Sequence, residues 1–222
     1  FSRIYMGGEY DIRGFDIYTI SPMGFFPTIG QVCNRDNAGN QILALNANGQ
    51  STGVCGSFTR FPYNTIQFPG GDTELLTNFE YRIPIAGPVT LAPFVDVGST
   101  FIMRPDQLRL QPSALSSIGN EFPYFKPDLP AELRPIGVTN FRPRGSTGLE
   151  IQVILPVVNA PFRVFYGYNF LRLNDTITPP QALPPVSLFP NVQTYNDALP
   201  YFRPFPLRDR KARLGFTVAR QF

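Results

Sequence analysis

Five segments of the chain alternate between apolar and polar residues with a period of two, and this pattern limits the fold more than any other feature. Alternation at that period is typical of β-strands whose two faces meet different surroundings. Each segment has about the 9–11 residues that a tilted strand needs to cross a bilayer. The predicted strands lie at residues 73–83, 89–99, 146–156, 162–170 and 212–222.

The connections between these strands alternate strictly in length. "PIAGP" joins the first two strands and "PVVNAP" joins the third and fourth, whereas residues 100–144 and 171–210 separate the others. Transmembrane barrels sort their connections in this way, with short periplasmic turns and long extracellular loops. The long connections are rich in proline, which favours ordered but irregular structure because proline restricts the unfolded chain. Disordered loops are the alternative.

The polar face of the strands has different surroundings in a soluble β-protein and in a membrane barrel. In a soluble β-protein it faces water, whereas in a membrane barrel it lines a wet lumen and the apolar face meets lipid. Periodicity alone does not choose, but the sorted connections and the aromatic strand ends favour the membrane. The polar residues that share one face are Glu74, Asn78, Glu80, Arg82, Asp96, Glu150, Gln152 and Arg163.

The composition excludes several classes of protein. The 24 Pro and 19 Gly residues are too many for a helix-rich architecture. His is absent, which removes the commonest general base and metal ligand, so we expect no enzyme activity, no cofactor and no metal site. A net charge of +3 without a long basic run gives no sign of nucleic-acid binding.

Two cysteines, Cys33 and Cys55, flank a polar segment rich in Asn, Gly and Gln. Two Cys without His do not complete a zinc site. A disulfide that closes the polar segment is the favoured prediction, and it implies an oxidising compartment. Two unpaired thiols are the alternative.

The stretch "RIYMGGEYDIRGF" resembles a loop signature of the BamA family, the factors that assemble β-barrels in the outer membrane. "PGGDTELLTNFEYRIP", "LAPFVDVGS", "GSTGLEIQVILP" and "PFRVFYGYNF" follow in the order of the family, and the last strand ends in an aromatic residue. The signature falls on Arg3, Tyr5, Gly7, Gly8, Ile12, Arg13, Gly14 and Phe15.

The resemblance covers nearly the whole chain but only the C-terminal part of a family member. It implies an all-β, antiparallel transmembrane barrel segment, with a long loop at residues 1–72 and five strands with two long loops at residues 73–222. Because a closed barrel needs about eight strands or more, further strands are expected upstream, and pairing of the five-stranded segment with partners is the alternative.

The resemblance also implies an arginine latch. In the family this loop folds into the lumen, and its arginine meets acidic side chains on the wall, which match Glu80 and Asp96. Gly14 is expected to allow a tight turn beside Arg13, and Phe15 to pack over the guanidinium. An exposed arginine at a hairpin tip is the alternative. The family often has a disulfide in the same loop, where Cys33 and Cys55 lie.

The last strand is the second site that the resemblance implies. In the family it pairs weakly with the first barrel strand, and an unpaired strand edge is a template for an incoming strand. Gly215 is expected to weaken the pairing. Phe216 and Val218 belong to the same terminal signal, in which Phe222 is an interfacial anchor. A plain barrel-closing strand is the alternative.

The implied function is insertion of nascent outer-membrane proteins. Its expected partners are outer-membrane lipid, accessory lipoproteins and upstream POTRA domains. Three alternatives stay open: a related protein-secretion translocase, a passive barrel such as a porin or receptor, and a soluble β-sandwich that binds a partner.

Overall fold

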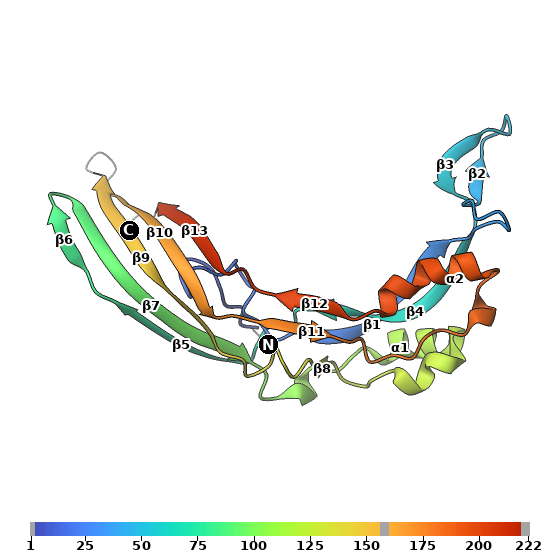
Figure 1. Cartoon of the computed structure of the whole chain (residues 1–222). Helices are drawn as coiled ribbons and strands as arrows, with labels where there is room; N and C mark the ends of the chain where they lie inside the picture. The colour runs from blue at the N-terminus through green and yellow to red at the C-terminus, as the bar shows by residue number, and fades with distance from the viewer. Residues whose placement is uncertain (1–2, 156–159, 219–222) are drawn as a thin grey trace.

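The computed structural model describes residues 3–155 and 160–218. It confirms the all-β prediction: the main element is a six-stranded antiparallel sheet in the order β13-β10-β9-β7-β5, with β6 paired to β7 (Figure 1). Within the described residues the sheet is open, and β5 and β13 form its edges. The strands are β5 (Thr73–Glu80), β6 (Ile83–Ala86), β7 (Val89–Phe101), β9 (Arg144–Leu155), β10 (Ala160–Leu171) and β13 (Ala212–Val218).

The first predicted strand, residues 73–83, is interrupted between β5 and β6. The backbone N–H of Tyr81 donates to the carbonyl of Pro93 in β7 at 3.0 Å, but Pro93 has no N–H to return the second bond of that pair. Pairing resumes with Ile83 opposite Leu91. Alternate residues of β6 therefore face the same sides of the sheet as they would if β5 continued without a break.

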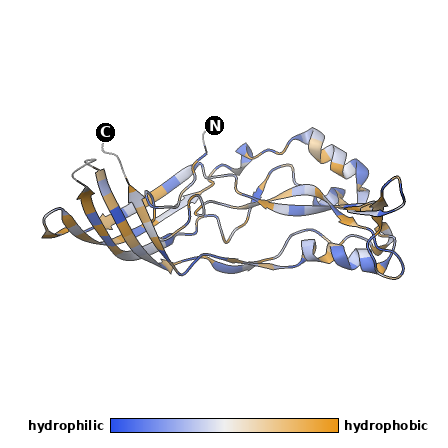
Figure 2. Ribbon diagram, turned by 90° about the horizontal axis from the view of Figure 1, so that it is seen from above, coloured by the Kyte–Doolittle hydropathy of each residue, from blue (hydrophilic) through white to orange (hydrophobic). Residues whose placement is uncertain are grey.

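The outward face of the sheet is apolar and exposed. Hydrophobic and hydrophilic residues alternate along the strands at the left of Figure 2. A soluble sandwich would bury such residues in its core, so this face does not fit that alternative. The largest exposed apolar side chains of the sheet include Leu75, Phe79, Leu149, Ile151, Tyr166, Leu214 and Phe216.

An elongated extension projects from the end of the sheet where the long connections lie (Figure 1). The proline-rich connections are ordered, and they form strands and short helices that sequence periodicity did not predict. The extension also contains a hairpin of two ten-residue strands from the first loop.

The strands of the extension are β1 (Gly24–Cys33), β2 (Leu43–Leu45), β3 (Ser51–Cys55), β4 (Phe58–Gln67), β8 (Arg134–Pro135), β11 (Asn174–Ile177) and β12 (Phe205–Arg208). Its helices are α1 (Pro112–Glu121), α2 (Val192–Ala198) and the 3₁₀ turns η1 (Pro105–Gln107), η2 (Pro123–Asp128), η3 (Val186–Leu188) and η4 (Leu199–Phe202).

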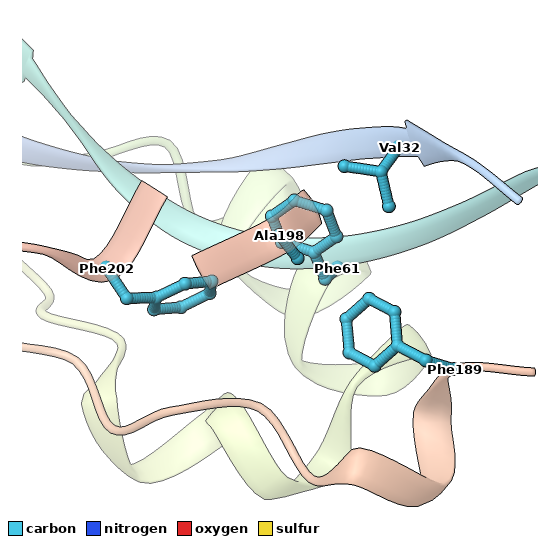
Figure 3. Close-up of a cluster of buried hydrophobic side chains, with 5 residues drawn as sticks. All are labelled: Val32, Phe61, Phe189, Ala198 and Phe202. Carbon is cyan, nitrogen blue, oxygen red and sulfur yellow. The ribbon is translucent and has the colours of Figure 1, made fainter. Parts of the chain in front are cut away.

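Aromatic packing holds the first loop and the last long connection together in this extension. Phe61 of β4 is fully buried and lies at the centre of a cluster with Val32 of β1 and residues from the α2 region (Figure 3). Asn191 caps the N-terminus of α2: its side chain accepts a hydrogen bond from the Thr194 N–H at 2.9 Å. The other buried members of the cluster are Phe189, Ala198 and Phe202.

The predicted disulfide is present. Cys33 and Cys55 are bonded across a sequence separation of 22 residues, at the end of β1 and the end of β3. It closes the polar tip of the extension, which contains the β2–β3 hairpin.

Replacing both cysteines with serine is expected to loosen this tip and leave the main sheet intact. A cross-link over a loop of this length contributes about 3 kcal/mol in the chain-entropy account. Limited proteolysis should then cut residues 34–54 faster in the double variant, with no change at residues 89–101. Equal cleavage rates in the tip of both proteins would contradict this expectation.

Two expectations fall on residues outside the described ranges. The short turn "PVVNAP" includes residues 156–159, and the terminal aromatic Phe222 lies in residues 219–222. No helix in the described part of the chain is long and apolar enough to span a membrane.

Candidate functional site

Residues 3–23, called here the inner segment, lie against the polar face of the main sheet. Met6, Ile12, Phe15 and Ile20 form a buried cluster, and Leu76 of β5 packs against it. The Thr100 hydroxyl of β7 donates to the carbonyl of Ile20 at 2.6 Å. This small apolar core holds the inner segment on the sheet. It places Arg13 against the polar face of the sheet, which is called the wall below.

Arg13 binds Asp96 of β7 through its guanidinium fork. Nε and Nη2 of Arg13 donate to the two carboxylate oxygens of Asp96, each at 2.8 Å. The backbone N–H of Arg13 adds a third bond to Asp96 at 3.1 Å. Asp96 is fully buried, so this is a bidentate, charge-assisted pair away from bulk water.

Two further carboxylates complete the arginine latch. Nη1 of Arg13 donates to Glu80 of β5 at 2.7 Å and to Glu150 of β9 at 3.1 Å. Burial lowers the pKa of the Arg13 guanidinium, but the hydrogen bond and charge of Asp96, together with the hydrogen bonds to Glu80 and Glu150, outweigh it, so the pKa lies above its ordinary value. One side chain thereby ties together three strands of the sheet.

Other arginines balance the charge around the latch. Arg82 donates to Glu80 at 2.6 Å, and Arg163 of β10 lies 3.7 Å from Glu150. With Arg13, these cations match the three carboxylates in number. A balanced cluster avoids the cost of an uncompensated charge in a partly dry interior.

The aromatic surface under the guanidinium is Phe94, and the expectation for Phe15 is wrong. The Arg13 guanidinium carbon lies 3.8 Å from the centre of the Phe94 ring. Phe15 instead packs in the apolar cluster of the inner segment. Phe94 comes from the wall, two residues before Asp96, so one strand supplies both the carboxylate and the ring.

Gly14 allows the inner segment to touch β10 directly. It has a positive φ of 95°, and a Cβ there would lie 2.4 Å from Oδ1 of Asn169. Its carbonyl accepts a hydrogen bond from Nδ2 of Asn169 at 2.8 Å. Gly167 lies at the same place, where an added Cβ would approach the Cα of Gly14 to 3.0 Å. The close approach requires glycine on both sides.

In the last strand, Gly215 has a packing role. It lies opposite Phe165 of β10, and an added Cβ would be 2.3 Å from that ring. The glycine therefore leaves room for Phe165 on the inner face. Phe216 and Val218 are 70% and 57% exposed on the outward face.

Sequence reasoning missed three members of this site: Phe94, Glu150 and Asn169. Glu150 and Asn169 lie on the predicted polar face of their strands. The alternation of residues predicts the face, but it does not predict which residues of that face lie level with Arg13. Phe94 carried a clearer signal, because it was the aromatic exception on the polar face of its strand. No group of metal-binding side chains occurs within the described residues.

Comparison with known families adds an identification. The model of the Omp85 superfamily domain matches residues 1–178, which include the inner segment and the strands up to β11. The chain belongs to the Omp85 superfamily. No curated protein and no solved structure matches it.

Membership of the Omp85 superfamily supports an outer-membrane location and a role in membrane-protein insertion or translocation in general terms. The open antiparallel sheet is consistent with part of an Omp85 barrel.

Proposed function

We propose that the chain is part of a BamA-like insertase, which folds and inserts other outer-membrane proteins by pairing their strands at the edge of β13. The observation that carries the proposal is the latch of Arg13 on three wall carboxylates in a chain of the Omp85 superfamily. The proposed mechanism is strand templating and local perturbation of the membrane, without bond chemistry.

The exposed outward face supports contact with lipid. Leu149 and Ile151 of β9 are 54% and 49% exposed, whereas Glu150 between them is 2% exposed. An apolar side chain in the hydrocarbon and a charged one toward the interior is the arrangement of a membrane barrel. Outer-membrane lipid is therefore the first proposed partner.

The edge of β13 supports strand templating. β13 pairs with β10 over residues Phe162–Tyr168, and within the described residues its other edge has no strand beside it. Such an edge presents unpaired N–H and C=O groups, which are a template for an incoming strand. Nascent outer-membrane proteins are the proposed clients, and POTRA domains and lipoproteins the proposed helpers.

Disulfide trapping in vesicles tests the proposal. Single cysteines replace Leu214 or Phe216 in β13, and Leu149 or Ile151 in β9 as matched controls with similar outward exposure. A client with a cysteine in its terminal strand should cross-link to the β13 positions alone. Equal cross-linking to β9, or none to β13, would contradict templating.

The same experiment separates the alternatives. A secretion translocase would cross-link its passenger from an inward position such as Gln152, and a passive barrel or receptor would cross-link to no client strand. The insertase is favoured here because the exposed apolar face and the edge of β13 lie together, at Leu214 and Phe216.

Replacing Ile151 with arginine is expected to block insertion of the protein into vesicles. An arginine facing lipid near the bilayer midplane costs about 2–4 kcal/mol. Gln152→Arg is the matched control, because it introduces the same side chain one residue away on the inner face. Heat modifiability on gels measures insertion, and equal behaviour of the two variants would contradict the assigned faces.

A further inference from the structure

The inner segment contacts the last strand as well as the strands that hold Arg13. Nη1 of Arg213 in β13 donates to the carbonyl of Phe15 at 2.7 Å and lies 3.3 Å from the Asp16 carboxylate. Arg213 lies opposite Gly167, the residue of β10 that Gly14 touches. The segment therefore crosses β10 and reaches β13 at a single level of the sheet.

A buried amide makes a second connection. Nδ2 of Asn169 donates to the carbonyl of Gly14 and to that of Arg210, at 2.8 and 2.9 Å. Asn169 is only 1% exposed. Because Arg210 lies in the segment that leads into β13, one side chain links the turn of the inner segment to the start of the last strand.

Aromatic packing forms a third route on the same face. The ring of Phe94, which carries the Arg13 guanidinium, meets the Phe165 ring edge to face at 6.4 Å. Phe165 in turn lies over Gly215 of β13. The latch and the last strand are thus joined by contiguous contacts across β9 and β10.

We propose that Arg213 and Asn169 are positioning residues that couple the arginine latch to the last strand. With the inner segment seated, these contacts hold β13 against β10 from the inside. When the segment leaves the wall, β13 loses the Arg213 contacts with Phe15 and Asp16 but keeps its pairing and packing with β10. The seam of the proposed insertase would then open more readily, and this consequence rests on the proposed function.

Hydrogen exchange of the intact protein in lipid vesicles tests the coupling. Arg213→Ala should speed exchange of the amides of residues 212–218 about tenfold, which corresponds to about 1.4 kcal/mol, the size expected for a charge-assisted hydrogen bond. Residues 89–101 should not change. Lys211→Ala, which removes a neighbouring positive charge, is the control and should leave β13 exchange unaltered.

Three further variants keep the test decisive if Arg213→Ala fails to fold. Asp16→Asn changes only the inner segment and should still speed exchange in β13, and Arg213→Lys should restore part of the protection. Arg13→Ala should speed exchange in β13 as well, although Arg13 does not lie on that strand. Unchanged β13 exchange in Asp16→Asn and Arg13→Ala would overturn the coupling.

Client insertion measured in the same vesicles separates this inference from the proposed function. Faster β13 exchange together with altered insertion supports both. Faster exchange with unaltered insertion supports the coupling and counts against templating at β13.

Discussion

Replacing Arg13 with alanine is expected to release the inner segment from the wall and to impair assembly activity. The change leaves Asp96 and Glu150 buried without their main cation, and breaking a buried ion pair costs about 3–5 kcal/mol. The guanidinium contact with Phe94 is lost as well. Hydrogen exchange of residues 6–20 and growth of cells that depend on the variant would measure the two effects.

Two control variants show whether the fork geometry matters. Arg13→Lys keeps the charge but not the bidentate fork, so an intermediate loss is expected. Arg82→Ala removes another arginine bound to Glu80, but its side chain is 60% exposed, and an exposed pair contributes about 0–1 kcal/mol. Normal growth with Arg13→Ala, or equal effects of Arg13→Ala and Arg82→Ala, would contradict the latch.

Gly14→Ala is expected to have the second-largest effect. Alanine at a positive φ costs about 1–2 kcal/mol. The new Cβ would also displace Asn169, whose buried amide joins Gly14 to Arg210. Loss of those hydrogen bonds adds about 1–3 kcal/mol. The free energy of unfolding in urea and the exchange of residues 6–20 would report the combined loss.

Gly39→Ala is the matched control for this substitution. Gly39 has a similar φ of 89°, but a Cβ there meets nothing within 4 Å. The strain is therefore nearly the same in both variants, and only the steric conflict differs. If the two substitutions destabilise the protein equally, the close packing of Gly14 against Asn169 is not important.

The fold of the main sheet was predictable because period-two alternation depends only on the surroundings of the two faces of each strand. Within the described residues strands appear at all five predicted places, the fifth as far as Val218, and the first is interrupted opposite Pro93, which lacks an N–H. The extension was not predictable in the same way. Its strands and helices pack through aromatic contacts such as Phe61 with Phe202, which join residues distant in sequence and leave no periodic pattern.

The site was predictable where a family signature and strand parity agreed, as at Arg13, Glu80 and Asp96. The error at Phe15 arose because the sequence places it two residues after Arg13, whereas the side chain that reaches the guanidinium is Phe94 of β7. Asn169 and Gly167 could not be assigned, since their roles depend on how closely the inner segment approaches β10. Such distances are properties of the tertiary structure.

Spin-label accessibility along β9 tests the orientation of the sheet most directly. Single cysteines at positions 149 to 153 of the intact protein, in lipid vesicles, would be labelled and probed with oxygen, which collects in lipid, and with a water-soluble nickel chelate. The labels at Leu149, Ile151 and Val153 should meet oxygen, and those at Glu150 and Gln152 should not. The reverse pattern, or uniform exposure to the nickel chelate, would contradict a lipid-facing apolar surface with Arg13 held inside.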